Sequence, residues 1–171
     1  MFSLEMFLEP SADSQIRALW QELTTKSIVT LPEVWARPHI TLAICSTLDG
    51  IDHKALGAVC EDMPQNIKIS TYGQFLGAPG VLQLGLTPTR ELMALHGAVH
   101  DVLDSTNSAC DPLYVPDVWI PHCTISMGMK AEDLGTLRTT LQNLKPIAGR
   151  ITEIAWVDNR AGRELSVASP F

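Results

Sequence analysis

The sequence contains one short pattern twice: a proline, then histidine, any residue, threonine and an apolar residue. The two copies are Pro38-His39-Ile40-Thr41-Leu42 and Pro121-His122-Cys123-Thr124-Ile125, about eighty positions apart in a chain of 171 residues. A single copy of so short a pattern carries little information, but two copies indicate two related halves. Each half would then contribute one imidazole and one hydroxyl group to a shared site.

Hydrophobic periodicity predicts that strands and helices alternate in both halves. Gly77-Ala78-Pro79-Gly80 predicts a turn that joins two strands as a hairpin near the midpoint, so the halves are roughly 1–77 and 81–171 of one bilobal domain, 1–171. Antiparallel sheets backed by helices are the natural packing for this order, which is an α+β design. Strands are expected at 3–9, around the first motif, and at 67–76, 81–87, 119–127, 150–157 and 163–168; helices are expected after Pro10-Ser11, after Asp52, at 89–104 and at 131–144.

The two-residue period of a strand places the motif side chains on defined faces. His39, Thr41 and Ala43 are expected on one face of the first motif strand, and His122 and Thr124 share a face of the second. The proline before each histidine fixes its own φ angle and supplies no N–H donor. Both motifs are therefore expected at an edge strand or at the start of a strand.

Two histidines and two hydroxyl groups suit acid–base chemistry at a phosphate. Displacement at phosphorus needs a base on the attacking oxygen and an acid on the leaving oxygen. Because unperturbed histidines titrate at about pH 6.5, one can be neutral while the other is protonated. Threonine hydroxyl groups can donate hydrogen bonds to the phosphate oxygens where negative charge builds up.

Two such His-x-Thr motifs in a two-lobed chain of this size resemble those of the 2H phosphoesterase superfamily, and within it the 2′–5′ RNA ligase-like and cyclic nucleotide phosphodiesterase branch. The resemblance implies two pseudo-symmetric antiparallel sheets with outer helices and a metal-independent site in a central cleft. It implies that His39 and His122 are the acid and the base, and that Thr41 and Thr124 bind the phosphate. It leaves open which histidine is the acid.

The sequence departs from the resemblance in two places. Many bacterial relatives have an arginine shortly after the second motif, where this chain has Ser126-Met127-Gly128-Met129. An aromatic residue that stacks on a nucleobase has no assured counterpart either. Candidates for further substrate contacts are Tyr72 and Phe75 near the end of a strand, Tyr114 in the long irregular stretch, and Arg37 beside the first motif.

The composition restricts the partners. The net charge is −7, and the 12 lysines and arginines are scattered along the chain. Long nucleic acids are bound mainly by clusters of such residues, so an extended duplex is not expected, and a small nucleotide or an RNA end is. No apolar run approaches the length of a membrane span, and Glu5 and Glu9 interrupt what could be a signal peptide. We expect a cytoplasmic monomer that does not bind a membrane.

No metal or other cofactor is expected. The four cysteines lack C-x-x-C spacing and are expected to be reduced. His96 and His100 have the i, i+4 spacing of a zinc site but lack the accompanying glutamate, so a solvated or partly buried helix flank is expected. Trp35 and Trp119 are expected to contribute to lobe packing rather than to serve as stacking platforms.

The sequence therefore predicts a metal-independent phosphodiesterase acting on 2′,3′-cyclic phosphates or other 2′-linked phosphoesters of nucleotides or RNA ends. Two alternatives remain. One is cleavage or ligation of 2′–5′ linkages. The other is a module that binds nucleotides or RNA ends without turnover, which the completeness of both motifs disfavours.

Overall fold

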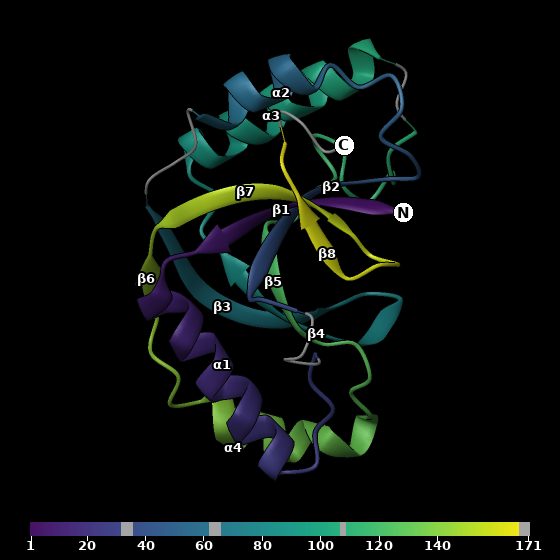
Figure 1. Ribbon diagram of the computed structural model, residues 1–171. Helices are drawn as coiled ribbons and strands as arrows, with labels where there is room; N and C mark the ends of the chain where they lie inside the picture. The colour runs from purple at the N-terminus through teal and green to yellow at the C-terminus, as the bar shows by residue number, and fades with distance from the viewer. Residues whose placement is uncertain (32–35, 62–65, 107–108, 168–171) are drawn as a thin grey trace.

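The computed structural model describes residues 1–31, 36–61, 66–106 and 109–167 (Figure 1). Trp35 lies outside these residues. The first half of the chain contains β1 (Phe2–Leu8), α1 (Pro10–Thr25), β2 (His39–Cys45), α2 (His53–Glu61) and β3 (Ile67–Phe75). The second half contains β4 (Ala78–Leu86), α3 (Arg90–Ser105), β5 (His122–Ser126), a 3₁₀ turn (Ala131–Asp133), α4 (Leu134–Leu141), β6 (Ile147–Gly149), β7 (Ile151–Asp158) and β8 (Arg163–Leu165).

The predicted order of strands and helices is confirmed, with several local differences. The helix expected at 131–144 is a 3₁₀ turn followed by the shorter α4, and β8 ends at Leu165. The central turn is shorter than expected, because Gly77 adopts a φ of 82° and a two-residue turn, Leu76-Gly77, joins β3 to β4. β5 begins at His122 rather than at 119, since Pro121 has no N–H to donate to a ladder. The short strand β6 was not predicted.

The strands form two antiparallel four-stranded sheets. Sheet 1 has the order β2-β1-β7-β8 and sheet 2 the order β5-β4-β3-β6. The α+β class with two antiparallel sheets is thus confirmed. Each sheet takes strands from both halves of the sequence: the tight turn after β3 obliges it to pair with β4 in sheet 2, while β7 pairs with β1 in sheet 1. The ranges 1–77 and 81–171 describe the sequence repeat, and the sheets exchange the last long strand of each half.

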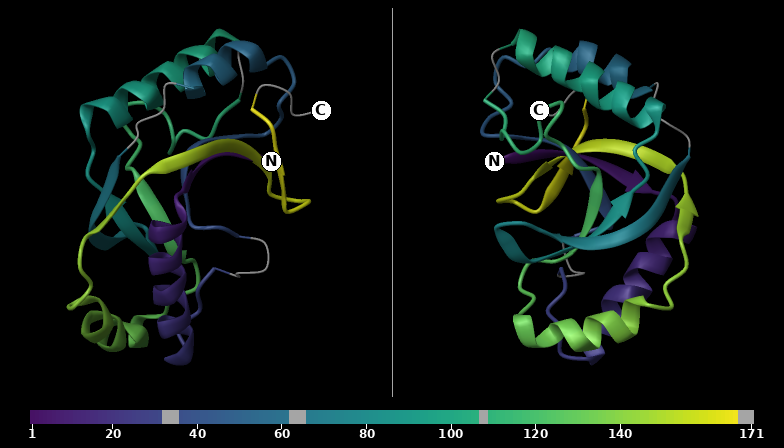
Figure 2. Two further views of the ribbon diagram at one scale, coloured as in Figure 1. Left: turned by 60° about the vertical axis from the view of Figure 1, so that its left-hand side comes forward. Right: turned by 180° about the vertical axis from the view of Figure 1, so that it is seen from behind.

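The helices cover the outer sides of the two sheets. α2 and α3 pack together beside sheet 1, and α3 contacts β2 (Figures 1 and 2). α1 contacts β6 of sheet 2, and Lys26 after α1 donates a hydrogen bond of 2.7 Å to Thr140 in α4. The sheets therefore lie between two layers of helices, so each sheet keeps one face directed toward the middle of the molecule.

Local sequence explains where the helices begin and which faces they bury. The Thr89 hydroxyl accepts from the Leu92 N–H at the start of α3, and Asp52 accepts from Ala55 before α2, as predicted. Buried apolar side chains from both sheets and from the helices form one continuous cluster. No helix in the described ranges combines the length and apolar character needed to span a membrane. The buried stripe of α1 consists of Ala12, Ile16, Leu19, Trp20 and Leu23.

Candidate active site

The two motif histidines occupy matching positions on adjacent strands. His39 is the first residue of β2, the edge strand of sheet 1, and His122 is the first residue of β5, the edge strand of sheet 2. β2 and β5 lie beside each other, and the charge of His39 contributes to lowering the pKa of His122. The fold thus brings together two imidazoles that are distant in sequence.

The two imidazoles are held in the same way. His39 Nδ1 lies 2.6 Å from the backbone oxygen of Arg37, and His122 Nδ1 lies 2.6 Å from that of Ile120. A carbonyl oxygen can only accept, so each Nδ1 carries the hydrogen, and in the neutral ring Nε2 is the unprotonated nitrogen. Neither Nε2 has a hydrogen-bond partner within the described part of the chain. Both Nε2 atoms are therefore available for proton transfer.

A β-bulge follows each motif threonine. Thr41 is opposite Glu5 on β1 but Ala43 is opposite Leu4, so Leu42 is the extra residue. On β5, Thr124 is opposite Gln83 and Ser126 is opposite Leu82, which makes Ile125 the extra residue. Bulges redirect side chains and are frequent beside active sites. In both strands, the alternation of side chains between the two faces of the sheet shifts by one residue directly after the motif threonine.

The bulge also corrects one expectation. Adjacent residues of β1 point to opposite faces, so Leu4 faces away from Glu5. Since Ala43 is opposite Leu4, it lies on the face opposite to Thr41, and the prediction that Ala43 shares the face of His39 is wrong. Ala43 is completely buried, whereas His39 and Thr41 are half-buried.

The residues that lie opposite the two threonines on the neighbouring strands differ in charge. Glu5 Oε2 lies 3.5 Å from His39 Nδ1, and Glu5 Oε1 accepts a 2.5 Å hydrogen bond from Ser3. Burial raises the pKa of Glu5, while the charge of His39 and the Ser3 hydrogen bond act in the opposite direction. At the matching position Gln83 is uncharged, and its Oε1 is buried without a partner among the described residues. An ionised Glu5 stabilises a positive charge on His39, and His122 has no such carboxylate opposite Thr124.

His122 lies in a less polar environment. The Phe75 ring packs edge-on against the His122 ring, with centroids 4.9 Å apart and an interplanar angle of 75°. Burial lowers the pKa of His122, the backbone oxygen of Ile120 opposes this effect, and the charge of His39 lowers it further. The lowered pKa favours the neutral form of His122, whose Nε2 is then free to accept a proton.

The family model of the 2′-5′ RNA ligase superfamily matches residues 8–163 of the sequence. The chain belongs to this superfamily of 2H phosphoesterases. It is similar in fold to the crystal structure of Escherichia coli LigT in apo form, with 17% identity over 95% of this chain and 90% of that one and a TM-score of 0.61. No curated protein sequence matches it.

Two further solved structures share the fold. A crystal structure of a phosphoesterase is 19% identical over 95% of this chain and 91% of that one, with a TM-score of 0.59. The PDE domain of MHV ns2 is 17% identical over 76% of this chain and 85% of that one, with a TM-score of 0.54. At these identities the likeness concerns the fold of this 2H phosphoesterase.

In this 2H phosphoesterase, Arg37 is already engaged by two carboxylates. Its Nη2 donates to Glu153 at 2.8 Å and to Glu164 at 3.1 Å. Its guanidinium lies 3.7 Å from the centroid of the Phe7 ring, and Phe7 is opposite His39 in the sheet. Arg37 therefore fixes the backbone oxygen that holds His39, and it would have to leave both carboxylates to reach a phosphate.

The candidate aromatic residues take different places. Phe75 contacts His122 directly. Tyr72 is opposite Leu84, which neighbours the histidine-side residues Gln83 and Gly85, so Tyr72 lies on the other face of sheet 2 and is 45% exposed. Tyr114 is half-buried in the connection between α3 and β5, where burial, Asp111 and Glu5 together raise its pKa. The structure thus brings Phe75 to the histidines, brings Tyr114 within electrostatic range of Glu5, and keeps Tyr72 away.

The sequence reasoning missed three supporting side chains. His96 and His100 are each 1% exposed, so the expectation of a solvated or partly buried flank is wrong. His100 Nε2 lies 3.2 Å from the backbone oxygen of Leu42 at the bulge, and Trp119 Nε1 donates to the backbone oxygen of Thr41 at 2.9 Å. These donors satisfy carbonyl groups at the outer edge of β2, beyond which sheet 1 has no further strand among the described residues.

His96 holds Trp119 in place. The two rings stack with centroids 4.0 Å apart, and His96 Nε2 lies 2.8 Å from the backbone oxygen of Tyr114. Burial and the nearby His100 lower the pKa of His96 to about 4, so it is neutral near pH 7. The sequence signal for this cluster was Trp119, which lies between two prolines just before the second motif. Its partners could not be predicted, because they are set by the tertiary fold.

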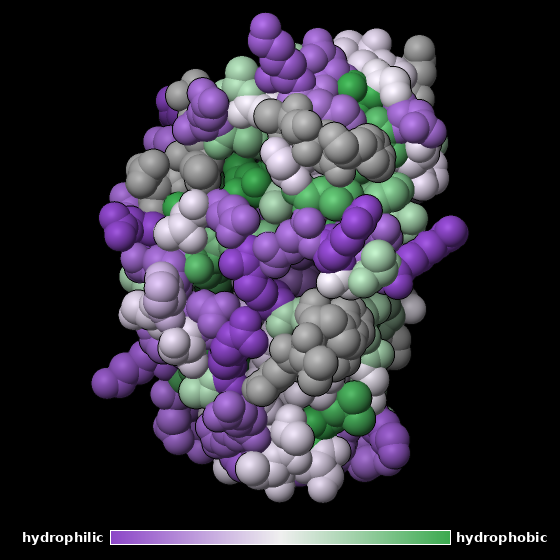
Figure 3. Space-filling model, in the orientation of Figure 1, coloured by the Kyte–Doolittle hydropathy of each residue, from purple (hydrophilic) through white to green (hydrophobic). Residues whose placement is uncertain are grey.

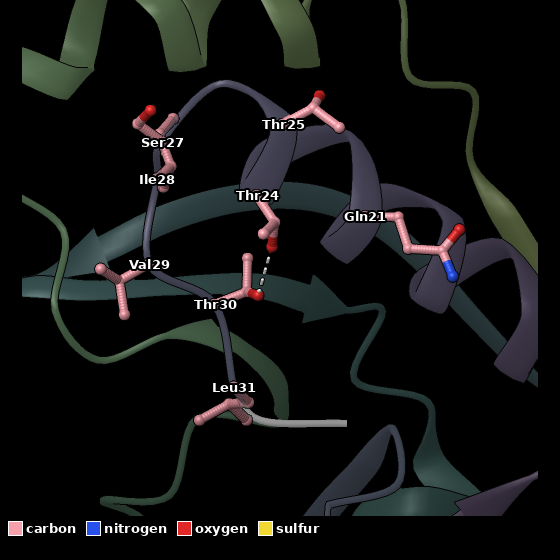
Figure 4. A pocket seen from close by; sticks show the side chains of 8 residues that line it. All are labelled: Gln21, Thr24, Thr25, Ser27, Ile28, Val29, Thr30 and Leu31. Carbon is pink, nitrogen blue, oxygen red and sulfur yellow. Dashed lines mark hydrogen bonds between the residues drawn. The ribbon is translucent and has the colours of Figure 1, made fainter. Parts of the chain in front are cut away.

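The structure also has a cavity that lies apart from the two motifs. A cavity of about 690 Å³ lies between the end of α1 and residues 27–31, and Thr24 and Thr30 hydrogen-bond across it (Figure 4). None of its lining residues belongs to a motif. Hydrophobic residues are scattered in small groups on the face seen in Figure 3. Within the described ranges, no three His, Cys, Asp or Glu side chains gather as metal ligands.

Proposed function

We propose that this 2H phosphoesterase is a hydrolase that opens 2′,3′-cyclic phosphates or cleaves other 2′-linked phosphoesters of nucleotides or RNA ends. The observation that carries the proposal is the matched pair of histidines, each fixed through Nδ1 at 2.6 Å with Nε2 left free, on adjacent edge strands. One group on each side of a phosphorus atom is the arrangement that in-line displacement requires.

The proposed roles follow from the two environments. His122, with its pKa lowered by burial, takes a proton from water through Nε2 as the water oxygen bonds to phosphorus. His39, whose positive charge is stabilised by Glu5, donates its Nε2 proton to the ribose oxygen as the bond from that oxygen to phosphorus breaks. A cyclic diester thus becomes a monoester with a free ribose hydroxyl. After the product leaves, His122 releases its proton to the solvent and His39 takes one up, which returns both histidines to their starting states.

The threonines are proposed to bind the phosphate. Thr41 and Thr124 lie one strand repeat beyond the histidines on the same faces, and both are half-buried. Hydroxyl donors directed at non-bridging oxygens stabilise the charge that develops there. The two histidines perform both proton transfers, so the proposed reaction needs no metal ion.

A small substrate is favoured by the charges around His39. Glu5 lies 3.5 Å from His39, and Arg37, two residues before this histidine, is paired with Glu153 and Glu164. Together with a net charge of −7, these carboxylates disfavour a long polyanion. A single phosphate group on a nucleotide or an RNA end meets less repulsion.

The same site could run in the opposite direction. The superfamily is named after 2′-5′ RNA ligase. In the ligation direction, microscopic reversibility would make His39 the base and His122 the acid. A ligase needs both a cyclic phosphate end and a free hydroxyl end as substrates, so product analysis separates the two activities.

The proposal is tested by incubating the protein with 2′,3′-cyclic nucleotides, 2′–5′ dinucleotides and RNA ends in EDTA and following the products by phosphorus NMR. We expect conversion of the cyclic phosphate to a monoester, with His39→Ala and His122→Ala as controls of strongly reduced activity. Activity lost in EDTA and restored by zinc would contradict the metal-independent reaction. Nucleotide binding without conversion of any substrate would instead indicate a binding module.

A further inference from the structure

Two of the four cysteines face each other across a short backbone bridge. Cys45 is the last residue of β2, and Cys110 lies in the connection between α3 and β5. Their sulfur atoms are 2.6 Å apart, and both cysteines are free thiols. Cys60 and Cys123 are also buried free thiols, with no cysteine partner among the described contacts.

The backbone geometry suits a covalent bond between these sulfurs. The Ser46 N–H donates to Ala109 at 3.3 Å, and the Asp111 N–H donates to Ile44 at 2.8 Å. The hydrogen bonds thus belong to the neighbours of the pair, so Cys45 and Cys110 form a non-hydrogen-bonded antiparallel pair. In such pairs the Cα atoms are about 4.5 Å apart and the side chains approach most closely. This separation lies within the range that a disulfide spans.

The chemical environment distinguishes Cys110 from the other thiols. The hydrogen bond from the Cys45 thiol lowers the pKa of Cys110, although burial and the charge of Asp104 oppose the effect. Burial raises the pKa of Cys60 and of Cys123 to about 12. Cys110 is also half-buried, whereas Cys45 is 1% exposed. Since the thiolate is the reactive form, Cys110 is the cysteine that an external reagent reaches first.

We propose that Cys45 and Cys110 form a reversible disulfide that fastens the end of β2 to the connection leading to His122. That connection carries Tyr114, Trp119 and the Ile120 oxygen that holds the His122 ring. β2 carries His39 and Thr41. The bond therefore links the segments that present the two halves of the candidate active site.

The reaction balances with a small-molecule disulfide such as oxidised glutathione. The Cys110 thiolate attacks one sulfur of the reagent and releases one glutathione thiolate, which leaves a mixed disulfide on Cys110. The Cys45 thiol then loses its proton and attacks the Cys110 sulfur, which releases a second glutathione thiolate. The two protein thiols are oxidised, the reagent is reduced to two thiols, and an excess of reduced glutathione reverses both steps.

The test follows the free thiols of the full chain in mixtures of reduced and oxidised glutathione. Samples are quenched with an alkylating reagent in denaturant and analysed as intact protein and as peptides by mass spectrometry. We expect the number of alkylated cysteines to fall from four to two, with Cys45 and Cys110 linked and Cys60 and Cys123 alkylated. Treatment with dithiothreitol should restore all four.

Variants separate this bond from other thiol chemistry. Cys110→Ser should form no intramolecular bond, whereas the double variant Cys60→Ser, Cys123→Ser should form it as the native chain does. The melting temperature of the oxidised native chain should exceed that of the reduced chain by roughly 5–10 °C, because the bond closes a long loop. Four alkylated cysteines in every mixture, a bond involving Cys60 or Cys123, a stable glutathione adduct on Cys110, or an unchanged melting temperature would each overturn the proposal.

Discussion

The edge strands β2 and β5 of this 2H phosphoesterase begin with the same His-x-Thr sequence and have a bulge directly after the threonine, but the neighbouring strands place different groups beside them. Glu5 lies opposite Thr41 and close to His39, whereas Gln83 lies opposite Thr124. Phe75 packs on His122, and its burial lowers the pKa of that histidine. The two copies of the motif are thus alike in sequence and in backbone, and the adjacent strands give their histidines different surroundings.

The largest expected effect tests whether both edges are needed. His39→Ala or His122→Ala should each lower kcat by about 10²–10⁴-fold, because each change removes one of two proton transfers. The steady-state rate on a 2′,3′-cyclic nucleotide measures this loss, and thermal denaturation checks that the fold persists. Near-native activity in a folded His39→Ala or His122→Ala variant would show that one of the two edges is not needed.

Removing the charge opposite Thr41 should sharpen the comparison. Glu5→Gln removes the carboxylate that lies 3.5 Å from His39 Nδ1, so we expect kcat to fall roughly tenfold. The steady-state rate on a 2′,3′-cyclic nucleotide measures this change. The matched control is Glu9→Gln, which removes an acid that pairs with Arg150 at the end of the same strand. Equal effects of the two substitutions would remove the special role of Glu5.

The acid limb of the pH profile should report His122. A base must be unprotonated, and because the pKa of His122 is lowered, activity should persist below the ordinary titration range of histidine and fall at still lower pH. Phe75→Ala admits water beside the ring, so the acid limb should move to higher pH. Tyr72→Ala, on the other face of the same strand, should leave the limb in place. A profile without an acid limb would contradict His122 as the base.

The smallest expected effect concerns the support of β2. Trp119→Phe leaves the Thr41 carbonyl without its donor, so we expect a loss of about 1 kcal/mol in the free energy of unfolding and a few-fold rise in KM. Trp20→Phe is the matched control, because the buried Trp20 Nε1 has no hydrogen-bond partner in the described structure. Denaturant titration and substrate saturation curves measure the two quantities. A KM rise of equal size in both variants would show that lost volume, not the hydrogen bond, is responsible.

The sequence predicted the strands and helices because their periodicity and end signals are local. The α1 stripe, the Asp52 cap and the placement of each motif at an edge or at the start of a strand follow from residues within a few positions of one another. The exchange of β3 and β7 between the sheets could not be read from the repeat. It follows from the two-residue turn at Leu76-Gly77, which was predicted as a longer turn.

The rest of the candidate site depends on contacts between distant segments. Thr41 and Thr124 could be named from their motifs, but the bulges at Leu42 and Ile125 depend on the register with β1 and β4. Glu5 alternates with Leu4 and Met6, which was a signal for the inner face that the sequence reasoning did not use. His96 and His100 gave no sign that their partners would be backbone oxygens of another segment.

The central claim is that the two edges act as one acid–base site, and the double variant His39→Ala, His122→Ala tests it most directly. Its rate on a 2′,3′-cyclic nucleotide is compared with those of the two single variants under the same conditions. Groups that act as a unit are not additive, so the double variant should be no slower than the slower single variant, within about twofold. Losses that multiply, as for two groups that contribute independently of each other, would contradict the account.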